Sequence, residues 1–155
     1  TLTRHLTNEL RSAYDLKWSQ RGDLVEDLYL RNVAANDRFG NFKTIEDFNF
    51  ATGHAVSVKS IDLKAIQSLN PKTLERLLTK YVDDASAFNG HVQNVRVNGN
   101  VRTIDIQAGD IQSRELVLGY QPGNATKAQQ PIFAPVQQYA AKLSNPVAFS
   151  LFPVR

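Results

Sequence analysis

The chain has 155 residues, and its 18 Lys and Arg against 15 Asp and Glu give a formal net charge of +3. Hydrophobic residues make up 42% and charged residues 21%, an ordinary globular composition that excludes a disordered chain. Cysteine and methionine are both absent. Disulfides, cysteine-based zinc or iron–sulfur sites and a thiol nucleophile are therefore excluded. The small positive charge gives only mild support for a polyanionic partner.

The sequence predicts one domain without a membrane-spanning segment. No run approaches the roughly 18 apolar residues that such a segment needs, and the N-terminus lacks the apolar core of a signal peptide. Loop-like stretches at 32–41, 89–100 and 121–127 are too short to be domain linkers. Because even an initiator methionine is missing, we expect the chain to be an internal or processed part of a longer protein.

The first part of the chain predicts two helices and a pair of strands. Leucines recur at every fourth position of 2–14, and a second apolar stripe at helical spacing follows Gly22. Residues 42–50 and 55–61 are rich in side chains that favour strands, and they flank a turn at 52–54. We therefore expect two helices followed by a β-hairpin.

The rest of the chain alternates between helices and strands. A helix is expected from Pro71, which fits the first helical position, to about residue 88. The further expected elements are strands at 92–97 and 101–106 around a turn at 98–99, a strand at 115–120, a helix at 128–143 and a strand at 146–154. This order predicts an α/β fold, a small mixed sheet with helices packed on it.

Charged residues around the expected hairpin suggest metal-assisted phosphodiester chemistry. Ser57 and Lys59 are two positions apart on one strand, so they project from the same face. The acids Glu46 and Asp47 lie on the preceding strand, and Glu26 lies on the helix upstream. Carboxylates that converge near a lysine can hold a hard cation such as Mg²⁺ while the lysine steadies charge on phosphate oxygens.

These residues lie in segments that resemble a PD-(D/E)xK nuclease core. More closely, the chain resembles the C-terminal toxin domains of contact-dependent growth inhibition systems that have this restriction-endonuclease-like fold, several of which cut tRNA. The matching segments are WSQRGDLVE at 18–26, FKTIEDF at 42–48 and AVSVKSIDL at 55–63, with weaker echoes at 81–88, 113–116 and 126–129. The resemblance implies a nuclease toxin domain over 18–155, which follows an N-terminal helical extension over 1–17.

The resemblance also implies roles for the individual residues. Glu26 is the helix acid and Lys59 the strand lysine, and Ser57 stands where the general motif has an acid. The identity of the strand acid stays open. The surrounding residues align Glu46 with the acid of the family, whereas residue type favours Asp47. Neighbours on a strand point to opposite faces, so only one of the two should reach the metal. Glu26 and Asp47 (or Glu46) would hold Mg²⁺ or another divalent cation, Lys59 would neutralise charge on the phosphate, and Ser57 would orient water or the metal.

A row of basic residues is a candidate substrate surface. Lys72, Arg76 and Lys80 recur at every fourth position on one side of the long helix. Such a row can follow a phosphate backbone, although it is more commonly the solvated side of an amphipathic helix. Arg21, close to Trp18, is a further candidate contact to nucleic acid.

His54, in the expected turn between the two strands, has two interpretations. A histidine at this place could act as a general base or contact a phosphate. A solvated turn histidine is the more ordinary interpretation, and we favour it. His5 and His91 are interpreted as surface residues, and they are not spaced as a zinc site.

The expected function is a metal-dependent endonuclease toxin that cleaves phosphodiester bonds in tRNA of a target cell. The alternatives are a DNase with the same site and a non-catalytic module that binds nucleic acid or protein on the same fold. Taken singly, Glu26 could be a solvated helix residue and Glu46 with Asp47 could be strand-edge charges. The joint order and spacing of these residues with Lys59 favours the functional interpretation.

The resemblance further implies partners and a location. A nuclease toxin endangers its producer, so we expect a cognate immunity protein, acidic in character, that forms a heterodimer with a monomeric toxin. The domain is expected to be secreted as the C-terminal part of a large surface protein and to act in the cytoplasm of a target bacterium, without stable membrane insertion.

Overall fold

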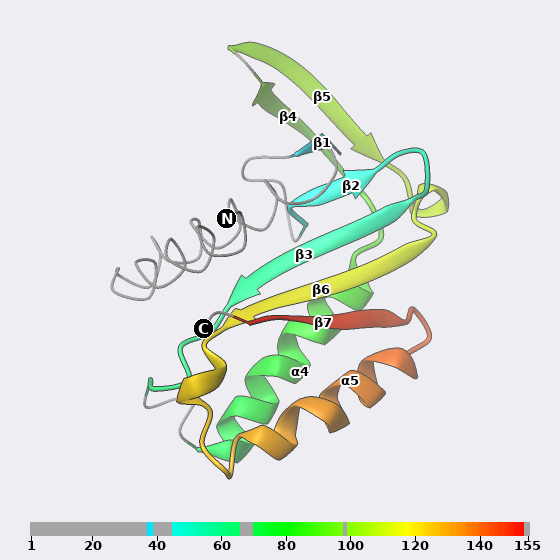
Figure 1. Cartoon of the computed structure of the whole chain (residues 1–155). Coiled ribbons are helices and arrows are strands. Elements are labelled where there is room, and N and C mark those ends of the chain that lie inside the picture. The colour runs from blue at the N-terminus through cyan, green and yellow to red at the C-terminus, as the bar shows by residue number, and fades with distance from the viewer. Residues whose placement is uncertain (1–36, 39–44, 66–69, 98, 154–155) are drawn as a thin grey trace.

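A five-stranded mixed sheet forms the centre of the molecule in a computed structural model, which describes residues 37–38, 45–65, 70–97 and 99–153 (Figure 1). The strands in spatial order are β1 (Asp37–Arg38), β2 (Asp47–Asn49), β3 (His54–Ser60), β6 (Ser113–Tyr120) and β7 (Val147–Pro153). Neighbours from β1 to β3 are antiparallel, and β3, β6 and β7 are parallel. The predicted mixed α/β sheet is confirmed, and β2 with β3 forms the predicted hairpin.

Two helices cover one face of the parallel strands. They are α4 (Pro71–Ala87), in the connection from β3 to β6, and α5 (Phe133–Ala141), in the connection from β6 to β7. Parallel neighbours need such crossovers, which bury the strands beneath helices. The main core joins Leu74 and Leu78 of α4 and Val136 of α5 to Leu116 and Leu118 of β6.

The start of α4 is set by local chemistry. Asn70 is the N-cap, and its side-chain oxygen accepts hydrogen bonds from the backbone N–H groups of Lys72 and Thr73 at 3.0 and 3.4 Å. Pro71 follows at the first helical position, where its missing N–H costs nothing. The predicted start of the helix is confirmed.

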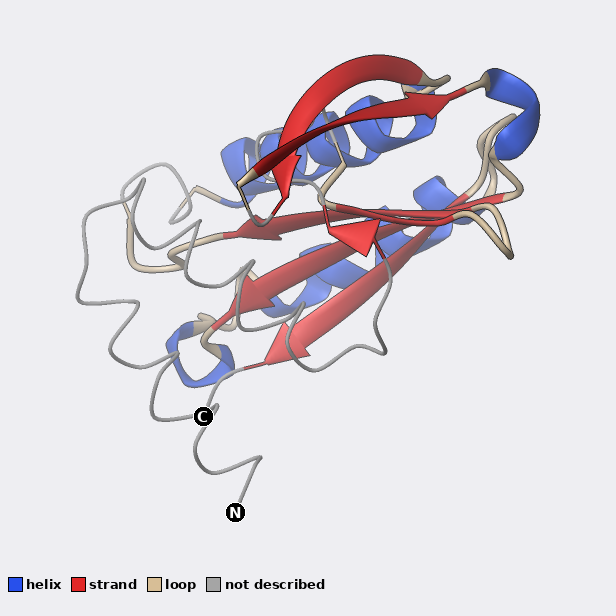
Figure 2. Ribbon diagram, turned by 90° about the horizontal axis from the view of Figure 1, so that it is seen from above, coloured by secondary structure: helices blue, strands red, loops and turns tan. Residues whose placement is uncertain are grey.

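A separate antiparallel hairpin stands beside the main sheet. It consists of β4 (His91–Val97) and β5 (Asn100–Ile106), and both views show it as its own ribbon (Figures 1 and 2). Its turn includes Gly99, whose φ of 81° suits glycine. Ile104 and Ile106 pack with Phe48 of β2 in a second buried cluster. The two strands predicted around this turn are confirmed.

The last predicted helix is shorter than expected. Residues Gln130–Ile132 form a 3₁₀ turn, and α5 begins only at Phe133 and ends at Ala141. Pro131 lacks the N–H of a helix interior, and it falls in this 3₁₀ turn ahead of the α-helix. Further 3₁₀ turns occupy Ala108–Asp110 and Pro122–Asn124.

Several predictions for the N-terminal part lie outside the described residues. They are the helices at 2–14 and after Gly22, the boundary between 17 and 18, and the first residues of the strand expected at 42–50. Among the helices that the structure describes, none has the length and apolar character to cross a membrane.

Candidate active site

The strand β3 divides the predicted site residues between two faces of the sheet. Ser57 and Lys59 stand in register with Leu116 and Leu118 of β6, and residues in register on parallel strands share a face. Both leucines belong to the core beneath α4 and α5. Ser57 and Lys59 therefore project toward the helices, on one face as their spacing predicts.

Lys59 lies near the end of β3 with an aromatic neighbour. It is half-buried, and its Nζ atom lies 5.8 Å from the ring centroid of Tyr81 on α4. A cation at this distance from a ring is attracted by the negative face of the π-system. Ser57, two positions earlier on the same strand, is buried. β3 thus accommodates Lys59 because the side chain is partly covered and its charged end faces the ring of Tyr81.

Glu46 is held against the edge of β3 on the same side as Lys59. Its backbone N–H donates to the carbonyl of Val56 at 2.9 Å, and its Oε2 accepts the backbone N–H of Val58 at 2.7 Å. The register of β2 and β3, continued by one residue, sets Glu46 opposite Ser57. The Glu46 carboxylate consequently lies next to the peptide bond between Ser57 and Val58, whose N–H it satisfies.

Asp47 occupies the other face of the sheet. It pairs with Val56, and cross-strand partners share a face, so Asp47 lies on the side of His54 rather than of Lys59. Its side chain is buried, with 2% of the residue exposed. The two acids are therefore separated by the sheet.

Glu46 and Asp47 carry oxygen donors of the type that binds a divalent cation. Carboxylate oxygens are the ligands that hard cations prefer. Among the residues that the structure describes, no group of three His, Cys, Asp or Glu side chains is close enough to hold a metal ion. The third acid, Glu26, lies outside the described residues, as does Arg21. The metal roles of Glu26, Asp47 and Glu46 stay predictions.

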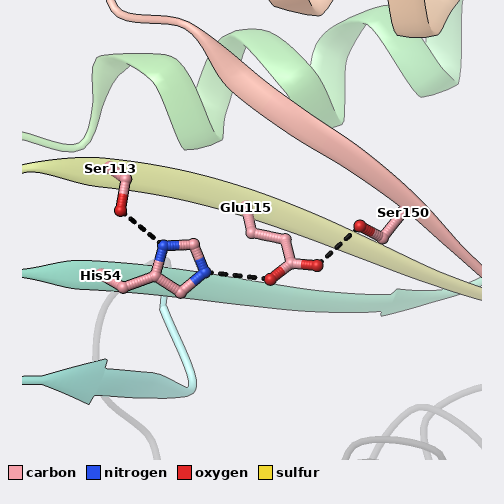
Figure 3. Close-up of polar contacts among 4 residues, drawn as sticks. All are labelled: His54, Ser113, Glu115 and Ser150. Carbon is pink, nitrogen blue, oxygen red and sulfur yellow. Dashed lines mark hydrogen bonds and ion pairs between the residues drawn. The ribbon is translucent and has the colours of Figure 1, made fainter. Parts of the chain in front are cut away.

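A polar cluster lies on the face opposite the helices, at the starts of β3 and β6 and on β7 (Figure 3). We call it the His54 cluster, and its members are His54, Ser113, Glu115 and Ser150. The Nε2 of His54 lies 3.0 Å from Oε1 of Glu115, and its Nδ1 lies 2.6 Å from the hydroxyl of Ser113. Ser150 donates to Oε2 of Glu115 at 2.6 Å. Three strands are thereby tied together by side chains.

The charges in the His54 cluster stabilise each other. The hydrogen bond that His54 donates to Glu115 raises the pKa of His54 above its usual value, the charges of Glu115 and Asp47 add to this, and partial burial opposes it. The pKa of Glu115 is lowered by the hydrogen bonds from His54 and Ser150, again against burial. Each group of the pair therefore stabilises the charged form of the other.

The interpretation of His54 as a solvated turn residue is wrong. His54 is the first residue of β3, with 32% of its side chain exposed and an ion pair to Glu115. Sequence reasoning also missed Glu115. The only local signal is a carboxylate at the start of an apolar strand, and its partner is 61 residues away in the chain. Only the parallel register of β3 and β6 brings the two together.

The basic row on α4 is exposed but not uniformly positive. Lys72, Arg76 and Lys80 lie on the outer side of the helix. They line a surface groove together with Glu75, Thr79, Asp83 and Asp84. Lys80 pairs with Asp84 at 3.1 Å. Acidic neighbours thus offset the row, and its role as a substrate surface stays a prediction.

The segment 126–129, one of the weaker matches to the toxin family, is fixed by hydrogen bonds of Thr126 and Gln129. The hydroxyl of Thr126 accepts the backbone N–H of Gln129, and the side chain of Gln129 accepts the N–H of Thr126, which closes a reciprocal cap. Gln129 is fully buried and donates to the carbonyl of Leu63. These contacts hold the segment before α5 against the end of the β3 region.

The mixed sheet with two crossover helices on one face defines a restriction-endonuclease-like α/β domain. Residues 21–151 match the family of the CDI toxin restriction endonuclease-like domain, where CDI denotes contact-dependent growth inhibition, and the chain belongs to this family. The predicted family and fold class are confirmed, and the chain is a nuclease-like toxin domain.

Two similar proteins place the chain more closely. It is 32% identical over 125 residues to a protein named deoxyribonuclease CdiA, from Yersinia pseudotuberculosis serotype O:3 (strain YPIII). This match covers 76% of the chain but only 11% of that relative. The fold is shared with a chain of the CdiA-CT/CdiI toxin and immunity complex from Yersinia pseudotuberculosis, with a TM-score of 0.64, 24% identity and coverage of 84% of this chain and 98% of that one.

Proposed function

We propose that this domain is a metal-dependent endonuclease whose reaction centre lies around the end of β3, on the face that carries Lys59. The observation that carries the proposal is the meeting of Lys59, Ser57 and the Glu46 carboxylate at one place of a sheet of restriction-endonuclease type. A positive side chain beside a carboxylate is the pairing that phosphodiester cleavage with a divalent cation requires.

Each residue has a role in this proposal. Glu26 and a strand acid would hold the cation, which when bound supplies polarisation of the phosphate and a lower pKa for the attacking water. Between the two strand acids the geometry favours Glu46, because Asp47 lies across the sheet from Lys59. Lys59 would neutralise charge that builds on the non-bridging oxygens, and Ser57 would orient a water or a metal ligand by a hydrogen bond.

DNA is the substrate that we propose first. The relative with 32% identity is named a deoxyribonuclease, and the match to it spans 125 residues of this domain. The second candidate is tRNA, which is favoured by the resemblance to toxin domains that cut tRNA. The site itself does not distinguish the sugars, since a metal and a lysine act on the phosphate that both polymers share.

Incubation of the domain with plasmid DNA and with total tRNA, each with Mg²⁺ or with EDTA, tests the proposal. We expect cleavage of DNA that depends on Mg²⁺ and is lost in Lys59→Ala. Lys64→Ala is a matched control, because Lys64 is exposed and lies beyond the end of β3. Cleavage of tRNA alone would make tRNA the substrate in place of DNA. If the folded protein cleaves neither nucleic acid, the proposed nuclease activity is refuted.

The proposal includes a partner and a route of delivery. The solved neighbour is a toxin in complex with an immunity protein, which supports a cognate immunity protein for this chain. We place the domain at the C-terminal end of a large secreted surface protein and its action in the cytoplasm of a target bacterium. Protection of cells by co-expression of a candidate immunity protein, with a 1:1 complex by size-exclusion chromatography, would support this partner.

A further inference from the structure

The His54 cluster contains the parts of a serine nucleophile site. Its carboxylate at Glu115 can only accept hydrogen bonds, so the bond at 3.0 Å requires a proton on Nε2 of His54. In the neutral ring, the proton on Nε2 leaves Nδ1 as an acceptor. The hydroxyl of Ser113, 2.6 Å from Nδ1, is then the donor. Nucleophile, base and orienting carboxylate stand in the order that activates a serine.

The surroundings of the cluster fit this order. Ser113 is exposed at the first position of β6, so an electrophile can reach its hydroxyl. Glu115 is more covered, with 21% of its side chain exposed, and the hydroxyl of Ser150 fixes its second oxygen. The exposed fraction thus rises from Glu115 to His54 to Ser113, as a reactive serine requires.

We propose that Ser113 is an activated nucleophile and a covalent modification site for acyl and phosphonyl electrophiles, with His54 as its base and Glu115 as the group that orients the base. This site lies on the opposite face of the sheet from Lys59, and its test by labelling does not depend on the proposed nuclease activity.

The reaction is a substitution at carbon or phosphorus. Oγ of Ser113 forms a bond to the electrophilic atom while its proton passes to Nδ1 of His54. The bond to an aryloxide or fluoride leaving group breaks with its electron pair, and His54 then returns the proton to that group. The imidazolium that exists in between is stabilised by Glu115, whose hydrogen bond also raises the pKa of His54.

Within the part of the chain that the structure describes, the two backbone N–H groups at the start of β6 are not free to form an oxyanion hole. The backbone N–H groups of Gln112 and Ser113 both donate to the carbonyl of Gly53, so neither is directed at an oxyanion on Ser113. Loss of one oxyanion donor costs a serine hydrolase about 10²–10³-fold in rate. We therefore expect stoichiometric modification of Ser113 with slow release rather than fast ester hydrolysis.

Labelling with a fluorophosphonate, followed by peptide mass spectrometry, tests the site in the intact domain. Ser144 is the internal reference, since it is exposed and lies in the connection between α5 and β7. We expect Ser113 to be labelled at least about tenfold faster than Ser144, because a positioned base contributes on the order of 10²–10⁴-fold. Equal labelling of the two serines would overturn the proposal and leave the cluster as a plain ion pair.

Variants separate activation from simple exposure. His54→Gln should lower labelling about 100-fold by removing the base, whereas the control His91→Gln on β4 should leave it unchanged. A single burst of p-nitrophenol from p-nitrophenyl acetate, equal to the protein concentration, is the second readout. An unaltered burst in His54→Gln, with the native circular dichroism spectrum, would also overturn the proposal. Because the reference serine is in the wild-type chain, the comparison holds even where a variant fails to fold.

Discussion

The two faces of β3 differ in what surrounds their polar residues. On the helix side, Lys59 and Ser57 stand at the border of an apolar core and Lys59 faces the ring of Tyr81. On the other side, His54 is enclosed in hydrogen bonds and an ion pair with Glu115. The charge of Lys59 on the first face lies beside an aromatic ring, whereas the charges of His54 and Glu115 on the second face satisfy one another. One strand can therefore present two different chemistries, because its side chains alternate between the two faces of the sheet.

The strongest loss of DNA cleavage is expected from a change on the helix side of β3. Replacement of Lys59 by Ala should lower the rate of DNA cleavage by about 10²–10³-fold, since a charge that stabilises the transition state is lost. Initial rates of plasmid nicking with saturating Mg²⁺ measure this. His54→Gln should lower the rate far less, so equal losses in the two variants would break the contrast between the faces.

A second prediction distinguishes Glu46 from Asp47 as the acid that holds the cation. Glu46→Gln should weaken the response to Mg²⁺ by about 10–100-fold, the range seen when a group at a metal site is removed. Asp47→Asn keeps the same volume on the opposite face and should change the response much less. The Mg²⁺ concentration at half-maximal rate is the readout, and a larger shift for Asp47→Asn would assign the metal to the other face.

The His54 cluster should make stability depend on pH. The pKa of His54 is raised, so its contribution is full below the unfolded value of 6.5 and is lost as pH rises through the folded pKa. The pKa of Glu115 is lowered, so its contribution is full above the unfolded value of 4.5 and is lost as pH falls through the folded pKa.

The two windows overlap between the unfolded pKa values of the two groups, 4.5 and 6.5. His54→Gln should therefore cost roughly 1 kcal/mol near pH 5.5, a value reduced for partial solvent exposure, and less at pH 9. Urea denaturation midpoints of both proteins at the two pH values measure this. A cost that grows toward pH 9 would contradict the raised pKa of His54.

The smallest expected effect concerns the outer side of α4. Lys72→Ala or Arg76→Ala should reduce the slope of log affinity against log salt by about 1 each if the side chain neutralises a phosphate. Lys80→Ala should have a smaller effect, because Lys80 is paired with Asp84. Fluorescence anisotropy with a DNA duplex at several salt concentrations measures the slopes. Identical slopes in all four proteins would remove this side of the helix from the substrate surface.

Much of the described fold could be predicted from local patterns. Asn70 and Pro71 mark the start of α4 because a cap and a proline at the first position act within one turn. The hairpin of β4 and β5 follows from β-favouring runs on either side of a glycine turn. The late start of the last helix has a local cause in Pro131, but the contact that fixes the preceding Gln129 to the carbonyl of Leu63 could not be predicted from propensity.

The candidate site could be predicted only in part. The two-residue spacing of Ser57 and Lys59 placed them on one face before any tertiary information, because alternation is a property of every strand. The strand acids were left open, and β-pairing alone separates Glu46 from Asp47 across the sheet. Glu115 was invisible as a partner of His54, since no local pattern relates residues on parallel strands that a helix and a hairpin separate.

Local patterns in the sequence were sufficient for the family, for the order of the described helices and strands from β2 onward, and for placing Ser57 and Lys59 on one face. These properties depend on residues a few positions apart, where spacing and propensity act directly. The acid that lies beside Lys59 and the carboxylate that binds His54 became known only from the folded structure. Those contacts are made across strands, and their geometry is set by the register that the buried core imposes on β2, β3 and β6.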